Sequence, residues 1–233
     1  MPASDNTSPQ PSDTAAESAA DVQDSPALMM FTRTLEAGQC KTRLIPEWGA
    51  EGALLIHRRL IERTLSIVRE FQEQTGCPVQ MHYAGSQPEE LARLMDDAGV
   101  QGTLQPQSAG DLGERLQAAL IDAARQGHTP LLVIGSDCPE LTAADLQEAL
   151  RVLRSKDVVV GPACDGGYYL LGMQKVWLSL LTDIPWGSAE VLTVTRTRLT
   201  ELRLTWGELA LRTDVDLPGD LTPAVRRLLN IQE

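Results

Sequence analysis

The sequence lacks the features on which several broad classes of protein depend. None of its apolar runs approaches the roughly 18 residues that a membrane-spanning helix needs, so we expect no membrane span. Its four cysteines include no C-x-x-C pair, which argues against a structural zinc site and is typical of reduced thiols in a cytoplasmic protein. The sequence also suggests no Ser-His-Asp or Cys-His arrangement for nucleophilic catalysis.

Positive charge is scarce as well. The formal net charge is -12, which argues against a broad surface for nucleic acid or for an anionic membrane. This balance still allows a phosphate ligand, because a locally basic loop and a divalent cation can hold one together.

The first 26 residues differ in composition from the rest of the chain. They contain five acidic residues and no Lys or Arg, and they are rich in Ser, Ala, Pro and Thr. Such a stretch cannot bury enough apolar surface to offset the entropy lost on ordering. It also lacks the basic start and apolar centre of a secretory signal. We therefore expect a disordered acidic tail over residues 1–26 and one folded domain over residues 27–233.

Apolar runs and amphipathic segments alternate along the rest of the chain. The runs predict strands over 27–32, 79–84, 103–107, 131–135, 158–160 and 168–171. The segments with helical spacing predict helices over 51–74, 88–98, 111–126, 142–155 and 188–200, and one starting at 221 or 222. Asp111 suits the N-cap position of its helix, and Thr142-Ala-Ala-Asp145 resembles a capping box. This alternation is typical of an α/β protein with a doubly wound, mostly parallel sheet and helices on both faces.

The most informative segment is LLVIGSDCP at positions 131–139. Four apolar residues without alternation predict a strand buried on both faces, and Asp137 follows where that strand ends. The residue before a proline avoids helical backbone, so Cys138 and Pro139 stop the chain from continuing as a helix. Ligands of open α/β sheets bind at the carboxyl ends of the strands, where one carboxylate suits Mg²⁺. The alternative is that Asp137 caps the next turn.

A basic loop follows the first predicted strand. Arg33, Lys41 and Arg43 lie within eleven positions of each other, with Gly38 and Thr42 between them. Three cations near the carboxyl end of a strand indicate a cradle for phosphate. The loop lacks the spacing of a Walker A motif, and the alternative is a solvated basic loop.

Two acidic motifs come later in the chain. The first is Asp165-Gly166-Gly167-Tyr168, whose glycines allow close approach to a ligand, although Asp-Gly alone favours an ordinary hairpin turn. In the second, the alternation of an extended segment puts Asp214 and Asp216 on one side, where they could share a cation. The alternative for this pair is an exposed acidic turn before a helix.

Taken together and in order, these motifs resemble a known family. The matching pieces are Gly38 with KTRL at 41–44, GDLGER at 110–115, GSDCP at 135–139, GPA at 161–163 with DGGYYL at 165–170, PWG at 185–187, and DVD at 214–216 with Pro218 and Asp220-Leu221. They resemble a bacterial family in the nucleotide-diphospho-sugar transferase superfamily. It is often described as GT-A-type glycosyltransferases, and some members are linked by name to arsenosugar biosynthesis. The basic loop and the DVD motif also look like guanylyltransferases that act on phospholactate or phosphoenolpyruvate, with molybdenum-cofactor guanylyltransferases as more distant relatives.

The resemblance implies a Rossmann-like GT-A fold and a transferase that uses Mg²⁺ or Mn²⁺. It implies Lys41 and Arg43 as phosphate ligands and Asp137 as a metal ligand, with Asp216 the likelier second ligand of the closing pair. Relatives more often have Lys and Pro where Arg33 and Leu35 stand, and the Gly-Gly of the sugar nucleotidyltransferase loop is absent. The loop therefore departs from the pattern in shape.

The predicted site has four groups of residues. We expect catalysis by Lys41, Asp137 and Asp165, and metal binding by Asp137, Asp214 and Asp216. We expect nucleotide binding by Arg33, Gly38, Lys41, Thr42, Arg43, Gln107, Asp111 and Arg115, and substrate binding by Gly166, Gly167, Tyr168 and Trp186. His57 falls on an apolar helical stripe and is expected in the core.

Three functions follow from this site. The first is nucleotidyl transfer from a nucleoside triphosphate to a small phosphorylated acceptor, favoured because a triphosphate needs more positive charge than a diphosphate sugar. The second is glycosyl transfer from a nucleotide sugar. The third is nucleotide binding without catalysis. All three involve small molecules, with no nucleic acid and no membrane as partners.

Overall fold

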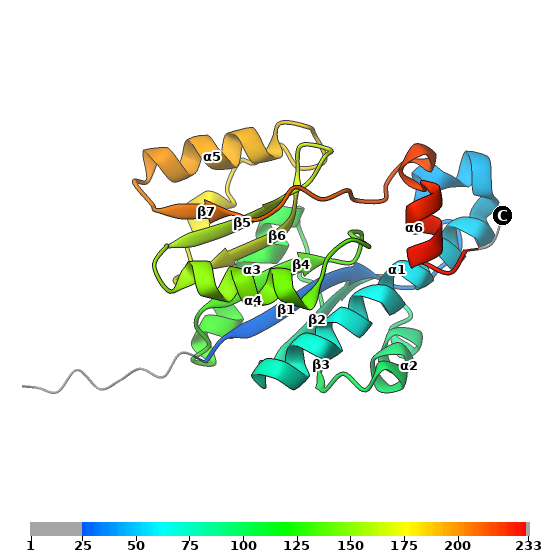
Figure 1. Ribbon diagram of the computed structural model, residues 1–233, viewed down its shortest axis with the longest axis horizontal. Helices are drawn as coiled ribbons and strands as arrows, with labels where there is room; N and C mark the ends of the chain where they lie inside the picture. The colour runs from blue at the N-terminus through cyan, green and yellow to red at the C-terminus, as the bar shows by residue number, and fades with distance from the viewer. Residues whose placement is uncertain (1–24, 232–233) are drawn as a thin grey trace, which may run out of the picture.

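The computed structural model describes residues 25–231 (Figure 1). The predicted acidic tail therefore lies, except for its last two residues, outside the described residues. Ser25 forms an isolated antiparallel bridge with Thr129 just before the first strand. Within residues 25–231, no helix is both long enough and apolar enough to cross a membrane.

The structure is built on one seven-stranded sheet with the order β3-β2-β1-β4-β6-β5-β7. The strands are β1 (Ala27–Arg33), β2 (Val79–Ala84), β3 (Gly102–Pro106), β4 (Leu131–Gly135), β5 (Val158–Pro162), β6 (Tyr168–Met173) and β7 (Trp206–Glu208). All neighbours pair in parallel except β6, which is antiparallel to both β4 and β5. The predicted α/β class with a mostly parallel sheet is confirmed.

Helices cover both faces of the sheet because successive side chains of each buried strand point to opposite faces. Leu28 and Met30 of β1 pack in the cluster with helices α1 (Ile45–Thr75), α2 (Glu89–Ala98) and α4 (Ala143–Leu153). Met29 and Phe31 pack on the other face with α3 (Leu112–Arg125) and α5 (Val191–Glu201). Strands without polar alternation are therefore the expected product of this two-sided core.

The predicted capping residues and the predicted hairpin are confirmed. Asp111 accepts a hydrogen bond from the backbone N–H of Glu114 at 2.9 Å, and Thr142 accepts one from Asp145 at 3.2 Å, each within a capping box. The Asp-Gly-Gly segment joins the antiparallel strands β5 and β6. All four cysteines are unpaired, and Cys164 alone among them is exposed.

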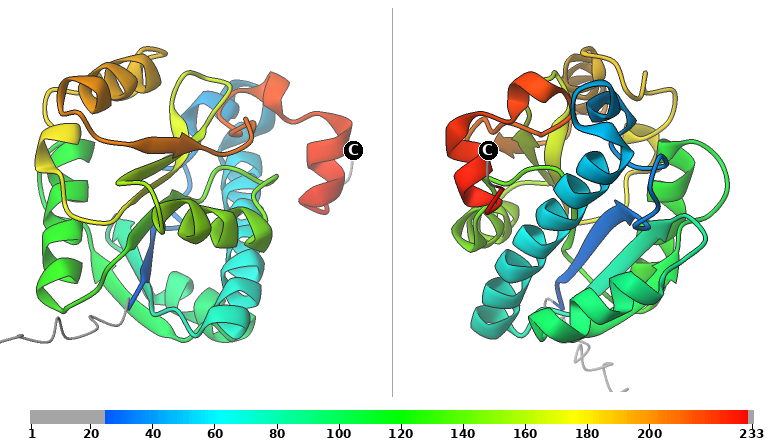
Figure 2. Two further views of the ribbon diagram at one scale, coloured as in Figure 1. Left: turned by 60° about the vertical axis from the view of Figure 1, so that its left-hand side comes forward. Right: turned by 90° about the vertical axis from the view of Figure 1, so that its right-hand side faces the viewer.

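The start of α1 differs from the prediction. A loop was expected up to about position 46 and a helix from 51, whereas a 3-10 turn forms over Thr42–Leu44 and α1 begins at Ile45. The helix is kinked at Gly49, whose φ is 65°. Its first turns pack against helix α6 (Pro223–Leu228) in a separate apolar cluster (Figure 2). This contact joins distant parts of the chain, so the local pattern could not indicate it. Strand β7 was not predicted, because a strand of three residues is too short to show a hydrophobic pattern.

Candidate active site

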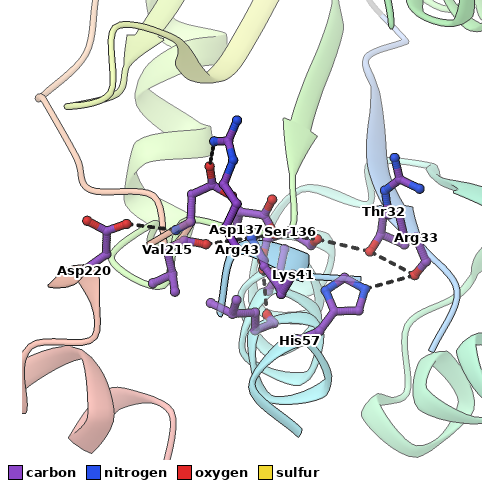
Figure 3. A network of polar contacts seen from close by, with 12 residues as sticks. Thr32, Arg33, Lys41, Arg43, His57, Ser136, Asp137, Val215 and Asp220 are labelled. Atoms are coloured by element: carbon purple, nitrogen blue, oxygen red, sulfur yellow. Dashed lines mark hydrogen bonds and ion pairs between the residues drawn. The ribbon is translucent and has the colours of Figure 1, made fainter. Parts of the chain in front are cut away.

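The candidate site lies where the strand order reverses. β1 has β2 on one side and β4 on the other, so the connections that follow β1 and β4 run away from each other. A crevice lies between them at the carboxyl ends of these two strands. Such a switch point is the usual place for a ligand in an open α/β sheet. A hydrogen bond of 3.1 Å between the hydroxyls of Thr32 and Ser136 joins the two strand ends (Figure 3).

Lys41 and Asp137 form an ion pair in this crevice. The Lys41 Nζ atom lies 2.9 Å from Asp137 Oδ1 and donates to the backbone oxygen of Val215 at 2.6 Å. Only 6% of the Lys41 side chain is exposed, and its backbone is left-handed with φ of 48°. Burial would raise the pKa of Asp137, but the ammonium of Lys41 and the Ser136 hydroxyl outweigh it and hold that pKa below its usual value.

Asp214 is a second carboxylate near Asp137. Its Oδ1 atom is buried and has no hydrogen-bond partner. Burial, followed by the charges of Asp137 and Asp165, raises the pKa of Asp214 to about 7. The next residue, Val215, fixes this arrangement, because its N–H donates to the backbone oxygen of Asp137 at 2.8 Å. Three carboxylates from separate parts of the chain thus influence each other at one point.

Asp216 has a different partner from Asp214. Arg43 donates to Asp216 Oδ2, and this pair is largely exposed, with 60% of the Arg43 side chain accessible. The backbone N–H of Asp216 donates to Asp220 Oδ2 at 2.9 Å (Figure 3). The sequence placed Asp214 and Asp216 together and favoured Asp216 as the second metal ligand. In the structure Asp214 is the one whose charge interacts with Asp137.

Two adjoining cavities open at this edge of the sheet. The first, which we call the basic cavity, has a volume of about 760 Å³. Its charged lining consists of four cations and two carboxylates, namely Arg33, Lys41, Arg43, Arg115, Asp137 and Asp216. A surplus of cations at the carboxyl ends of strands suits an anionic ligand such as a phosphate chain.

Gln107 and Arg115 are linked in the wall of the basic cavity. The Gln107 amide donates to the backbone oxygens of Thr32 and His82 at 3.1 and 3.0 Å. Its Oε1 accepts from Arg115 at 3.4 Å, while the Arg115 Nε donates to the Gly110 oxygen at 2.9 Å. The amide is therefore fixed by backbone and in turn holds the guanidinium.

The second cavity, which we call the acidic cavity, has a volume of about 450 Å³. Its charged lining consists of four carboxylates and one cation, namely Asp165, Asp214, Asp216, Asp220 and Arg43. Most of the remaining wall is apolar or aromatic. Tyr168 and Trp186 meet edge to face there, with ring centroids 6.1 Å apart.

Most of the predicted site residues gather around these two cavities, and three do not. Gly38 and Asp111 line neither cavity, and Asp111 serves as the cap of α3. Gly166 also lies outside the lining. Its φ of 89° and its approach to Ala189, whose oxygen would lie 2.2 Å from an added Cβ, account for a glycine there. His57 is buried as expected, and its Nε2 atom lies 3.2 Å from the Arg33 backbone oxygen.

The sequence analysis missed several lining residues. Phe31 and Leu112 line both cavities, and Thr32 and Ser136 support the crevice between the strand ends. Thr32 and Ser136 could have been found, because each lies near the carboxyl end of a buried strand. Phe31 and Leu112 carry no such signal, since an apolar residue in a buried strand or at the start of a helix is ordinary sequence.

The side chains of this site could hold a divalent cation only if a bound substrate supplied some of the coordinating oxygens. Within residues 25–231, no cluster of three or more His, Cys, Asp or Glu side chains is arranged to hold a metal. Asp137 and Asp214 nevertheless offer two nearby carboxylates, one with an unpartnered oxygen. Mg²⁺ usually takes one or two carboxylates and completes its shell with phosphate oxygens and water, so the two residues suit it.

Solved structures of other proteins share this fold. A candidate nucleotide-diphospho-sugar transferase from Desulfovibrio desulfuricans G20 is 26% identical with a TM-score of 0.77, and the match covers 89% of this chain and 94% of that one. The inositol-1-phosphate CTP transferase from T. maritima is 13% identical with a TM-score of 0.57, covering 90% and 97%. A CMP:2-keto-3-deoxy-manno-octonic acid synthetase in complex with CTP is 13% identical with a TM-score of 0.54, covering 89% and 99%. The last two similarities concern the fold alone, and they agree with its Rossmann-like class.

The sequence comparisons identify the family without naming a reaction. No curated protein matches the chain. The profile of a family described as "Uncharacterized protein conserved in bacteria (DUF2064)" matches residues 67–188, which include β4, Asp137 and the turn with Asp165. Because this match covers more than half of the sequence, the chain belongs to the DUF2064 family.

Proposed function

We propose that this protein is a transferase that binds a nucleotide donor in the basic cavity and acts on it at Lys41, Asp137 and Asp214. The observation that carries this proposal is the position of these three side chains. They lie at the switch point of the sheet, between a cavity with surplus cations and a cavity with surplus carboxylates. A phosphate chain in the first cavity would end beside the second.

The cations of the basic cavity have different roles in this proposal. Arg33 and Arg115 take part in no ion pair within residues 25–231, so both guanidiniums are available to phosphate oxygens. Lys41 is held by Asp137 and the Val215 oxygen, so it would present a fixed charge. Hydrogen bonds from charged donors contribute roughly 1.5–3 kcal/mol each, enough for firm nucleotide binding.

Asp137 and Asp214 would hold Mg²⁺ or Mn²⁺ in the bound state. Such an ion neutralises the negative charge that develops on a phosphate leaving group. Ser136 and Lys41 both contact Oδ1 of Asp137, and they orient its carboxylate. Because one oxygen of Asp214 has no hydrogen-bond partner, we assign Asp214, rather than Asp216, as the second metal ligand.

Two reactions fit the site. Nucleotidyl transfer from a nucleoside triphosphate is supported by the four cations of the basic cavity. Glycosyl transfer from a nucleotide sugar is supported by the aromatic and carboxylate lining of the acidic cavity, and by the similarity to the candidate nucleotide-diphospho-sugar transferase from Desulfovibrio desulfuricans G20. The resemblance to glycosyltransferase-like proteins and to guanylyltransferases covers both.

Isothermal titration with GTP, CTP, UTP, UDP-glucose and GDP-mannose, each with and without Mg²⁺, tests the proposal. We expect at least one of these nucleotides to bind, with tighter binding when Mg²⁺ is present. Preference for a triphosphate over its nucleotide sugar supports nucleotidyl transfer, and the reverse preference supports glycosyl transfer. Asp137→Asn should remove the effect of Mg²⁺, while Asp183→Asn, an exposed position outside both cavities, should not. Failure of every nucleotide to bind would refute the proposal.

A further inference from the structure

The lining of the acidic cavity restricts the charge of its occupant. Asp165, Asp214, Asp216 and Asp220 line this cavity, and Arg43 is its one cation among the described residues. Arg43 is already paired with Asp216. A phosphate group in the cavity would therefore meet carboxylates without a free cation to offset them.

Cations near the cavity are engaged elsewhere. Lys41 pairs with Asp137, at 2.9 Å. Arg212, one residue before the lining residue Thr213, makes its ion pair with Asp145, at 3.0 Å. A divalent ion between Asp137 and Asp214 would share its charge with the phosphates of the donor, and Asp165 would remain uncompensated.

Two of the carboxylates are fixed by backbone donors. Asp165 Oδ1 accepts from the N–H of Gly167 at 2.8 Å. Asp220 Oδ2 accepts from the N–H groups of Asp216 and Leu217, at 2.9 and 2.6 Å, so this side chain mainly closes a turn. Asp214 is assigned to the divalent cation, so Asp165, whose Oδ2 accepts no hydrogen bond among the described residues, is left as the acceptor that faces an occupant.

The rest of the wall is suited to an apolar surface. Leu116, Val133 and Leu171 lie in the lining together with the rings of Tyr168 and Trp186. Aromatic and aliphatic side chains favour C–H faces, and carboxylates accept hydrogen bonds from hydroxyls. One side of the preferred occupant is therefore apolar and another side carries hydroxyl groups.

We propose that the acidic cavity binds an uncharged, hydroxyl-bearing molecule or group and rejects phosphorylated ones. This inference rests on the proposed function and deepens it. The occupant is the acceptor if the reaction is nucleotidyl transfer, and the transferred group if it is glycosyl transfer. The small phosphorylated acceptor expected from the sequence is replaced by a neutral alcohol.

Three probes with the same ring and different charge test this inference. Methyl α-glucoside is neutral, glucose 6-phosphate is anionic and glucosamine is cationic. Saturation-transfer NMR on the full-length protein gives their relative affinities, with Mg²⁺ and a nucleoside diphosphate or triphosphate that carries no sugar group beyond its ribose. We expect the neutral probe to bind at least about tenfold more tightly than the phosphate, a difference of about 1.4 kcal/mol. The inference is overturned if glucose 6-phosphate binds as tightly as the glucoside, or if glucosamine is preferred tenfold. It is also overturned if neither the glucoside nor a panel of other neutral sugars and polyols binds.

Two substitutions connect the result to the cavity. Asp165→Asn should weaken the neutral probe by several fold, and Asp165→Lys should allow glucose 6-phosphate to bind. Glu190→Gln, exposed and outside the lining, is the control. Nucleotide titrations of the same samples separate the two proposals. If a nucleotide binds and the neutral probes do not, only this inference fails. If the neutral probes bind and none of the nucleotides binds, the proposed function fails.

Discussion

The basic and acidic cavities lie side by side and yet differ in charge. They share Phe31, Arg43, Leu112, Gly135 and Asp216 in their linings. Among its other residues, the basic cavity takes several from the loop after β1 and from the segment that follows β4. The acidic cavity takes several from the β5–β6 turn and from the segments before α5 and α6. One sheet edge therefore carries two opposite chemistries, because different crossovers of the chain reach it.

The two ion pairs near the boundary between the cavities differ in the solvent exposure of their cations. The Lys41 side chain is 6% exposed and tied to the backbone of Val215, whereas the Arg43 side chain is 60% exposed. The two carboxylates are similar, since 44% of the Asp137 side chain and 39% of the Asp216 side chain are exposed. Exposed pairs contribute little to stability because water and salt screen them. We therefore assign Lys41 to the framework of the site and Arg43 to its adjustable part.

The largest expected effect is on stability, at Asp214. An unfolded Asp loses its proton near pH 4, while burial and neighbouring carboxylates raise the pKa of folded Asp214 to about 7. Between these values the folded state holds more protons, so this residue lowers the free energy of unfolding as the pH rises, and its effect is constant above pH 7. Asp214→Asn should therefore be more stable than the wild type above pH 7, by on the order of 4 kcal/mol.

Urea unfolding of both proteins at pH 4 to 8 measures this difference. It should be small at pH 4 and grow to its full size near pH 7. Parallel profiles for the two proteins would show that Asp214 does not carry the raised pKa.

The next effect concerns activity, at Asp137. Asp137→Asn keeps the shape of the side chain and removes a negative charge from the lining of the basic cavity. We expect turnover to fall by roughly 10²–10³-fold, the size seen when one charge-stabilising group of an active site is removed. Steady-state kinetics with the nucleotide identified by titration measures the loss. Circular dichroism should confirm a folded variant, and normal Mg²⁺-dependent activity in that variant would contradict the assignment.

Substitution of the two cations sharpens the comparison between the ion pairs. Lys41→Ala should weaken nucleotide binding about tenfold or more and also lower the free energy of unfolding by about 1–3 kcal/mol, since it leaves Asp137 and the Val215 oxygen without their donor. Arg43→Ala should weaken nucleotide binding similarly while changing stability by less than about 1 kcal/mol. Titration and urea unfolding give both quantities for each variant. Equal losses of stability in the two variants would show that the pairs are equivalent.

The smallest expected effect is at Gln107. Its loss should free the guanidinium of Arg115 from one contact, at a cost of about 1 kcal/mol in nucleotide binding, or roughly fivefold in affinity. Gln107→Ala should leave binding of neutral probes to the acidic cavity unchanged. Gln105→Ala on β3, whose amide contacts only Thr103, is the matched control. A loss of neutral-probe binding in Gln107→Ala would mean that the two cavities are not separable.

The sequence by itself determined the class of fold and the ends of several elements. The run before Asp137 has no polar alternation because both faces of β4 are covered. This pattern could be read from the sequence, since it is carried by consecutive residues of one strand. The caps at Asp111 and Thr142 were readable for the same reason, since each cap and its partner are three residues apart. The acidic and basic motifs could be placed at strand ends, because alternation of strands and helices brings those ends to one edge.

Tertiary structure alone decided which charges meet. Lys41 reaches Val215 across 174 positions of sequence, and Arg43 reaches Asp216 across 173, so no spacing rule could pair them. The same long-range contacts gave Asp214 and Asp216 different partners, although both line the acidic cavity, as the alternation of an extended segment allows. They also set the start of α1, where Leu44 and Trp48 pack against α6. Charge at a site depends on the nearest neighbours in space, whereas a sequence pattern reports only neighbours along the chain.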